Sequence, residues 1–269
     1  FSLDGNAHKY RDWLKRGHGH VDLSRSIAES CDVYYYALAR DLGIARIHQK
    51  LSEFGLGQFT GIDLPGETSG LLPSAQWKRR ARSLPWYPGE TLITGIGQGF
   101  MLTSPLQLAY ATATIANRGR RLVPHVVGQI EDPMALVASE IGIHEREPIK
   151  LSNPLHWENV IDGMLEVVHG LRGTARGSSI GASYRYAGKT GTAQLFGIAQ
   201  DEVADNEQTP QHLRDHALFI AFAPQENPQI ALAIVVENGG SGSVAAAPIA
   251  RKILDRYLRA NEIGTVDNG

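Results

Sequence analysis

Apolar residues recur at helical spacing along much of the chain, which places them on one face of each segment. Ser24 or Ser26 can start the first helix, and Gly43 can end a later one. In the last helix, Ile249, Ile253, Leu254 and Tyr257 are expected on one face. The pattern predicts helices within 23–54, interrupted at 30–32 and at Gly43, and further helices over 105–115, 157–169 and 245–258.

The last third of the chain has a different pattern. Three consecutive runs, 184–196, 216–223 and 230–237, are rich in apolar and β-branched residues, which is typical of strands. The segment 224–228 is short and turn-forming, so it predicts a hairpin between the last two strands. Helices first, then an antiparallel sheet and a closing helix, is the order of an α+β fold.

Three further segments lack a strong periodic pattern. The segment 61–90 is rich in turn-forming Pro and Gly. Its basic cluster, 78–82, is interpreted as a solvated loop flank or as a contact for an anionic surface. A short strand is expected over 122–127. The segment 197–214 is long, polar and acidic, which indicates a mobile loop or an interaction surface.

Composition places the chain among globular domains. Its 269 residues, 42% hydrophobic and 20% charged, are enough for one extensive core. A net charge of -2 and the small size of the basic cluster give nucleic-acid binding no support. No apolar run approaches the length of a membrane span. The single cysteine, Cys31, excludes a disulfide within the chain.

The stretch Lys189-Thr190-Gly191-Thr192 has the clearest chemical meaning. A lysine here offers an ammonium to a carboxylate, and the two threonines add hydroxyl donors beside it. Gly191 lets the strand backbone approach a ligand closely. A Lys-Thr-Gly of this kind is one of three short motifs that build the acyl-serine site of penicillin-binding proteins and serine β-lactamases.

A second candidate motif is Ser30-Cys31-Asp32. In such sites a Ser-x-Asn or Ser-x-Asp loop faces the nucleophile, where its hydroxyl relays a proton and its third residue binds the substrate amide. Ser30 or Asp32 also fits the ordinary role of an N-cap for the helix that follows. The two roles are compatible, and the Lys-Thr-Gly downstream favours the catalytic one.

These motifs and several other stretches together resemble a known family. Over nearly its whole length, to about Leu258, the chain resembles the transpeptidase domain of the penicillin-binding protein 2 family, the elongation-specific class B enzymes of Gram-negative bacteria. The resemblance implies a penicillin-binding fold, in which an antiparallel sheet flanked by helices lies beside an all-α subdomain. The other stretches are Tyr10-Arg11-Asp12-Trp13, Gly17-His18-Gly19, 60–64, 95–99, 213–216 and 237–240.

The resemblance implies a D,D-transpeptidase that cross-links peptidoglycan stem peptides through an acyl-serine and binds β-lactams. It places Ser30 in the proton relay, Lys189 and Thr190 on the donor carboxylate, and the N–H of Thr192 in the oxyanion hole. No cofactor is required for this chemistry. The remaining expected substrate contacts are Asp32, Gly191 and Gln98, of which Gln98 also fits a structural turn.

One departure from the family pattern concerns the nucleophile. The third motif, Ser-x-x-Lys, is absent, because no lysine of the chain has a serine three places before it. In the family this motif precedes Ser-x-Asn. The chain, 1–269, is therefore expected to be the C-terminal part of one transpeptidase domain, unable to form an acyl-enzyme alone. The nucleophile segment and a membrane anchor are expected upstream of Phe1.

Two functions remain open on this pattern. The first is the catalytic one, for which the resemblance implies the periplasmic face of the inner membrane as location. Its implied partners are the membrane glycosyltransferase and the scaffold of the rod complex. The alternative is a non-catalytic β-lactam-sensing or scaffold module of the same fold, which the missing serine would suit.

A structural zinc ion is a separate expectation. Asp12, His18 and Cys31 offer a carboxylate, an imidazole and a thiolate, and a structural zinc site takes four such ligands. The fourth would precede Phe1, where some relatives carry an additional aspartate, or would be His20. Alternatively, Cys31 is a small buried thiol, His18 a surface loop residue and Asp12 a turn residue.

Overall fold

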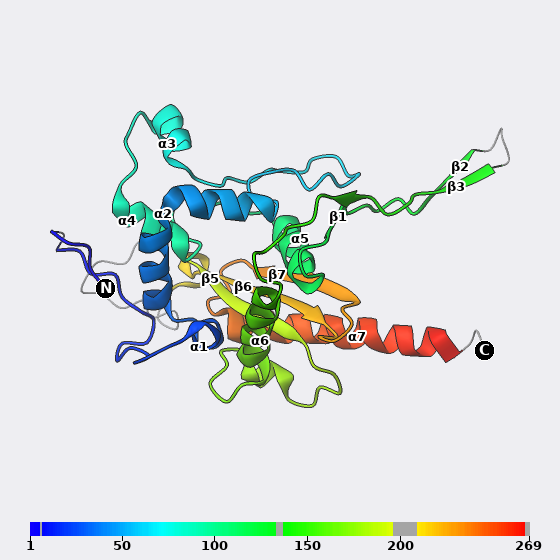
Figure 1. Ribbon diagram of the computed structural model, residues 1–269. Coiled ribbons are helices and arrows are strands. Elements are labelled where there is room, and N and C mark those ends of the chain that lie inside the picture. The colour runs from blue at the N-terminus through cyan, green and yellow to red at the C-terminus, as the bar shows by residue number, and fades with distance from the viewer. Residues whose placement is uncertain (6, 133–136, 196–208, 267–269) are drawn as a thin grey trace.

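The computed structural model describes residues 1–5, 7–132, 137–195 and 209–266. Its centre is an antiparallel three-stranded sheet in the order β5-β6-β7 (Figure 1). All three predicted strands are confirmed, although the first is shorter than expected. The strands are β5 (Ala187–Ala193), β6 (His216–Ala223) and β7 (Ile230–Val236).

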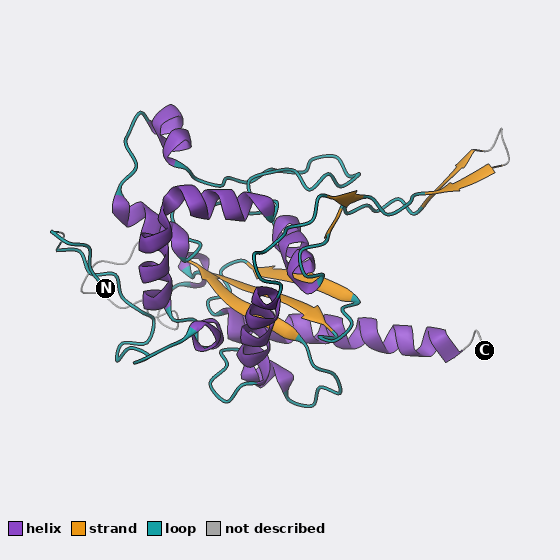
Figure 2. Ribbon diagram, in the orientation of Figure 1, coloured by secondary structure: helices purple, strands orange, loops and turns teal. Residues whose placement is uncertain are grey.

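Helices cover this sheet and form a second region beside it (Figure 2). They are α1 (Leu23–Ala28), α2 (Asp32–Glu53), α3 (Ala75–Arg82), α4 (Pro88–Gly95), α5 (Pro105–Ala116), α6 (Leu155–His169) and α7 (Ala247–Val266). Helix α6 contacts β5, while α5 and α7 both contact β6 and β7. Helix α1 packs on α6, and α4 packs on α2. The α+β fold predicted from the sequence is confirmed.

The hydrophobic core lies where α6, the sheet and α7 meet. Ile161, Tyr186, Phe219, Phe222 and Leu254 are fully buried there. Each such side chain contributes about 1.5–3 kcal/mol by leaving water. These residues come from α6, β6, α7 and the position just before β5, so their packing fixes the position of β5 relative to the helices.

The buried face of α7 differs from the predicted one. Leu254 is fully buried, whereas Ile249, Ile253 and Tyr257 remain 41–42% exposed. The sheet contacts only a narrow face of this helix, so the broader apolar pattern does not show which residues are covered.

Within the described residues, no helix is both long enough and apolar enough to cross a membrane.

The starts and breaks of the first two helices follow local chemistry. Asp22, and not Ser24 or Ser26, caps α1, because its carboxylate accepts a hydrogen bond from the N–H of Arg25 at 2.8 Å. Gly43 lies inside α2 with φ 72° and ψ 157°, which breaks the helix as predicted. The turn at residues 29–31 separates α1 from α2.

Two helices in the turn-rich segment 61–90 were not predicted. Ser74 caps α3, and Pro88 begins α4. Lys78 of the basic cluster is 2% exposed. Its ammonium donates to the carboxylate of Glu90 and lies 4.3 Å from the centre of the Tyr87 ring. The prediction of a loop flank is therefore wrong, because the cluster lies on helix α3 and its one lysine is buried. Its three arginines, Arg79, Arg80 and Arg82, are exposed to solvent as expected.

A two-stranded arm projects from the body beyond α5 (Figure 1). It consists of β1 (Arg121–Leu122) paired with β4 (Glu145–Arg146), followed by β2 (Gln129–Asp132) paired with β3 (Val137–Glu140). The strand expected over 122–127 matches only the end of β1.

Most of the acidic segment 197–214 lies outside the described residues, which resume at Thr209.

The buried ion pair between α3 and α4 gives a test of the fold. Glu90→Gln is expected to lower the free energy of unfolding by about 3 kcal/mol, because it leaves the ammonium of Lys78 buried without a charge partner. Lys78→Met should lower the free energy of unfolding less, since the side chain of Glu90 is 23% exposed and water can solvate its carboxylate. Urea unfolding measures both, with Arg79→Ala as the exposed control on the same helix. Equal losses for the two variants would contradict this account.

Candidate active site

The two sequence motifs meet at one point of the structure. The ammonium of Lys189, on β5, donates a hydrogen bond to Oγ of Ser30, 159 residues earlier in the chain. It donates a second hydrogen bond to the carbonyl of Thr190 at 2.9 Å. The sheet and the helical region therefore touch through these two motif residues.

Ser30 has an unusual backbone conformation. Its φ of 53° places it in the left-handed region, which is uncommon for a residue with a side chain and costs of order 1–3 kcal/mol. The indole N–H of Trp13 donates to the carbonyls of Glu29 and Ser30, both at 3.1 Å. This conformation directs the hydroxyl of Ser30 toward Lys189, and the indole helps to hold it.

Burial shifts the protonation equilibria of the site. It lowers the pKa of Lys189 to about 8, against the opposing attraction of Asp32. Burial, and then the negative charge of Asp12, raise the pKa of Asp32 to about 6. Near pH 7 the lysine is therefore mostly charged and Asp32 mostly ionised. The pKa of the Cys31 thiol is raised, chiefly by burial.

The other residues of the Lys-Thr-Gly stretch have distinct surroundings. Oγ1 of Thr190 lies 2.9 Å from Oγ1 of Thr174, in the segment that follows α6. Thr192 is exposed. A Cβ added to Gly191 would lie 3.2 Å from Cβ of Leu218, so packing against β6 also favours glycine there.

Gln98 connects a turn after α4 to the end of β5. Its Nε2 donates to the carbonyl of Thr192 at 2.7 Å, and its Oε1 accepts from the N–H of Gln194 at 3.3 Å. Both ends of the amide are thus engaged by the strand backbone. This geometry favours the structural role of Gln98 over a direct contact with substrate.

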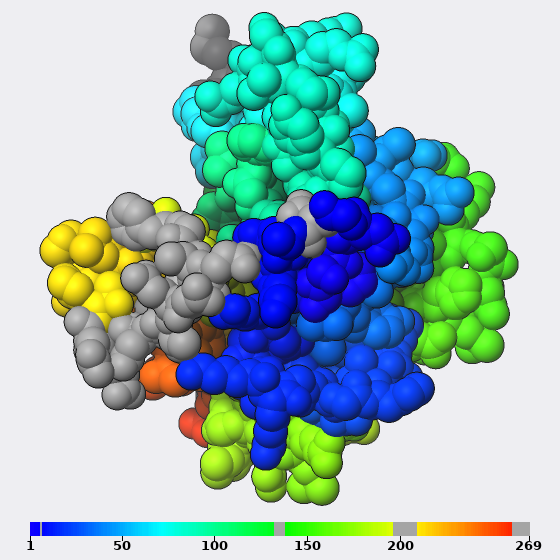
Figure 3. Space-filling view, turned by 90° about the vertical axis from the view of Figure 1, so that its left-hand side faces the viewer, coloured from blue at the N-terminus to red at the C-terminus, as the bar shows by residue number. Residues whose placement is uncertain are grey.

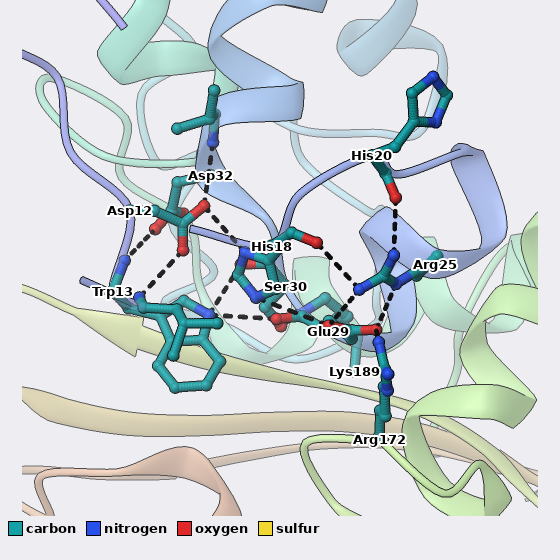
Figure 4. A network of polar contacts seen from close by, with 12 residues as sticks. Asp12, Trp13, His18, His20, Arg25, Glu29, Ser30, Asp32, Arg172 and Lys189 are labelled. Atoms are coloured by element: carbon teal, nitrogen blue, oxygen red, sulfur yellow. Dashed lines mark hydrogen bonds and ion pairs between the residues drawn. The ribbon is translucent and has the colours of Figure 1, made fainter. Parts of the chain in front are cut away.

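Asp12, His18 and Cys31 lie together beside the Ser30 turn. Figure 4 shows Asp12 and His18 of this cluster. One ligand atom from each lies within 4.8 Å of the others. The side chain of His18 is only 1% exposed, so it is not a surface loop residue. His20 is exposed, and its ring points away from the cluster, so it does not supply a fourth ligand here.

The chemistry of this cluster fits a metal ion. Nδ1 of His18 lies 3.3 Å from Oδ2 of Asp12, yet neither ring nitrogen has a hydrogen-bond partner among the described residues. Buried polar atoms without partners are rare in folded proteins, and a metal ion would satisfy one of them. Carboxylate, imidazole and thiolate together form a set that zinc accepts.

Asp12 also has a structural role that the sequence did not reveal. Its Oδ2 accepts from the N–H of Val33 at 3.3 Å, at the start of α2, where Cys31 provides no side-chain cap. Asp32 is the first residue of α2 and accepts from the N–H of Trp13 at 3.3 Å. The N-cap role considered for Ser30 or Asp32 is therefore filled from the N-terminal segment.

Glu29 is a further charged residue of the site that no motif indicated. Its carboxylate accepts from Nε of Arg25 at 2.6 Å and pairs with Arg172 at 3.6 Å (Figure 4). It lies 4.0 Å from Nε2 of His18. The hydrogen bond from Arg25 is the main cause of its lowered pKa. The only signal in the sequence was its spacing of four residues from Arg25 on a helix.

The N-terminal segment lies across the middle of one face of the molecule (Figure 3). In Figure 3 this blue segment lies between the cyan region around α3 and the yellow-green residues that follow α6. A pocket of about 920 Å³ lies between this segment and α4, lined by Tyr10, Tyr87 and Phe100 among others. Neither Ser30 nor Lys189 lines it, so it is distinct from the motif contact.

An α+β domain in which a Lys-Thr-Gly strand faces a Ser-x-Asp turn has the architecture of the penicillin-binding enzymes. Residues 2–255 match the family model described as "Penicillin binding protein transpeptidase domain", and the chain belongs to this family. The resemblance noted in the sequence is therefore confirmed.

Individual relatives agree with this assignment. The chain is 38% identical over 256 residues to "Peptidoglycan D,D-transpeptidase MrdA" of Haemophilus influenzae, covering 95% of this chain and 39% of that relative. A structure of Pseudomonas aeruginosa PBP2 in complex with WCK 5153 superimposes with a TM-score of 0.83 at 43% identity, covering 96% of this chain and 52% of that one. Helicobacter pylori PBP2 in complex with MreC gives 0.82 at 32% identity, covering 96% and 44%.

The electrostatics of Lys189 can be measured directly. In the folded chain its ammonium is expected to lose its proton near pH 8, compared with 10.5 for an ordinary lysine. Asp32→Asn should lower that midpoint further, because it removes the attraction that stabilises the ammonium. Since the unfolded chain holds this proton to higher pH, stability should rise as pH increases from about 8 to 10.5.

Lysine side-chain NMR gives the midpoint, with the urea-unfolded chain as the reference. A midpoint close to the unfolded value would show that the ammonium is not buried as described. A rise in the midpoint on Asp32→Asn would contradict the role given to that carboxylate.

Proposed function

We propose that this chain is the greater part of the transpeptidase domain of a peptidoglycan D,D-transpeptidase that acts in cell elongation. It spans 39% of the length of the H. influenzae relative, so the activity is assigned to the longer protein. The observation that carries the proposal is the hydrogen bond from Lys189 to Ser30, made within a fold whose relatives bear this name.

Each motif residue has a role that its position supports. The ammonium of Lys189 and the hydroxyl of Thr190 would bind the C-terminal carboxylate of the donor stem peptide. Ser30 accepts a hydrogen bond from Lys189, so its own proton is free for transfer between the nucleophile and the leaving amine. The N–H of Thr192 would help to stabilise the oxyanion. A pKa of about 8 keeps Lys189 close to the pH range in which it can also exchange a proton.

The nucleophile belongs to a Ser-x-x-Lys motif that these 269 residues do not contain. We assign it to a segment of the longer protein that precedes this chain. The competing function, a non-catalytic module that binds β-lactams or serves as a scaffold, would have the same fold with a substituted motif. Covalent labelling of the longer protein separates the two.

The proposal extends to location and partners. The relative from H. pylori was solved in complex with MreC, which supports a scaffold protein as a partner here. A membrane glycosyltransferase as second partner, and the periplasmic face of the inner membrane as location, follow from the family resemblance. Peptidoglycan stem peptides are the proposed substrates, and β-lactams the proposed inhibitors.

A structural zinc ion is part of the proposed function. Asp12, His18 and Cys31 would supply three ligands, and a residue outside this cluster would supply the fourth. The ion would link the N-terminal segment to the residue that follows Ser30. Its role would be structural only, because the proton transfers are assigned to Ser30 and Lys189.

Acylation tests the catalytic assignment. In the longer protein, Lys189→Ala is expected to lower the second-order rate constant for acylation by a penicillin about 100-fold, because the bound carboxylate loses its charge partner. Thr190→Ser should be mild, since the hydroxyl remains. The 269-residue chain alone should not be labelled by a fluorescent penicillin. Labelling of one of its own serines would overturn the location of the nucleophile. A folded longer protein that is never labelled would support the binding module.

Metal analysis tests the zinc site. The longer protein, purified without a histidine tag, is expected to carry one equivalent of zinc. Cys31→Ser and His18→Ala should reduce the zinc content and the melting temperature together, because metal binding contributes directly to folding free energy. His20→Ala is the matched control and should keep the metal. Absence of zinc, with Cys31→Ser as stable as the wild type, would leave Cys31 as a packed thiol.

A further inference from the structure

We infer that Thr174 is a positioning residue for the hydroxyl of Thr190, an inference that rests on the proposed function. Thr174 lies outside every motif recognised in the sequence. Its Oγ1 is 2.9 Å from Oγ1 of Thr190 and either atom can be the donor. Both residues are partly buried at the junction between the segment after α6 and strand β5.

The direction of this hydrogen bond decides what Thr190 can offer to a ligand. A hydroxyl has one proton and two acceptor lone pairs. If Thr190 donates to Thr174, its proton is withheld from a carboxylate. If Thr174 donates to Thr190, the proton of Thr190 remains free. A carboxylate beside Lys189 favours the second arrangement, because a hydrogen bond to a charged acceptor is stronger than one between neutral hydroxyls.

The resulting chain of hydrogen bonds would run from Thr174 to Thr190 and on to the carboxylate. Each bond in such a chain polarises the next, which strengthens the contact with the ligand. Thr174 does not touch the substrate in this scheme. It holds the rotamer of Thr190 and donates a hydrogen bond to it. Thr190 can then donate its own hydrogen bond to the carboxylate.

The backbone around Thr174 is held closely enough for this role. Its N–H donates to the carbonyl of Ala28 at 3.2 Å, and the N–H of Ala175 donates to the carbonyl of Val167 at 2.9 Å. A Cβ on Gly173 would lie 2.2 Å from the carbonyl oxygen of Glu166, so only glycine fits at that position. The turn is thus fixed to the ends of both α1 and α6.

This attachment places the turn between the two motifs. Ala28, which accepts from the backbone of Thr174, is two residues before Ser30. Thr174 therefore connects the end of α1, just before the Ser30 turn, with the strand of Lys189 and Thr190. A displacement of α1 relative to β5 would therefore strain the hydrogen bonds that Thr174 makes to Ala28 and Thr190.

The neighbouring ion pair is a weaker candidate for the same role. Arg172 lies 3.6 Å from the carboxylate of Glu29, and its side chain is 69% exposed (Figure 4). The guanidinium of Arg172 lies largely in water, and Glu29 already has Arg25 as a closer partner at 2.6 Å, so the contact with Arg172 contributes little. We therefore assign the positioning to the hydroxyl and backbone of Thr174, and Arg172 serves as a control.

The test is a double-mutant cycle on acylation of the longer protein by a penicillin. Thr174→Val keeps the shape of the side chain and removes the hydroxyl, and it is expected to lower the second-order rate constant about 5–10-fold. Thr174→Ser should stay within about twofold of the wild type, as should Arg172→Ala. In a Thr190→Val background, Thr174→Val should have no further effect, because Thr174 acts only through Thr190. Thr174→Ala gives the same comparison if the valine variant does not fold.

Three outcomes are distinguishable. Loss of the Thr174→Val effect in the Thr190→Val background, with unchanged melting temperatures, supports the inference. An equal effect of Thr174→Val in both backgrounds, or none in either, overturns it, because a purely structural contribution would not depend on the hydroxyl of Thr190. A folded wild type that is not acylated overturns the proposed function, and with it the basis of the inference.

Discussion

The hydrogen bond from Lys189 to Ser30 is the contact on which the functional geometry depends. An ammonium removed from water needs nearby acceptors or negative charge, and this one has the Ser30 hydroxyl, the Thr190 carbonyl and the attraction of Asp32. The Thr190 carbonyl is local to Lys189, but Ser30 is 159 residues away and no local structure brings it there. Helix α6 packs on β5 and α1 packs on α6, so the distance between strand and turn is set by helix packing.

The Ser30 turn is held from two sides. Trp13 donates to the carbonyls of Glu29 and Ser30 from the N-terminal segment, while the backbone of Thr174 donates to Ala28 from the segment after α6. Such support explains how Ser30 can keep a left-handed conformation that an isolated turn would disfavour. The same turn joins the Asp12–His18–Cys31 cluster to the motif contact, because Cys31 directly follows Ser30.

Much of the fold could be predicted, and the exceptions have physical causes. The long periodic helices and all three strands of the main sheet were found, because their patterns extend over several turns or pleats. Helices α3 and α4 were missed, since each has eight residues and is surrounded by Pro and Gly. The buried face of α7 was assigned wrongly, because its apolar pattern is broader than the face that the sheet covers. Asp22 replaced the expected serine caps, since aspartate and serine are both favoured at that position and three such residues lie close together here.

The sequence by itself determined the motif residues, their order and the α+β class, because these depend on residue type and local spacing. It also determined that His18, Asp12 and Cys31 were chemically suited to a metal ion. Only the tertiary structure decided that Lys189 reaches Ser30, that His18 is buried and His20 is not, and that Glu29 and Thr174 belong to the site. These relations join residues far apart in the chain. They follow from how helices and strands pack, which no short stretch of sequence encodes.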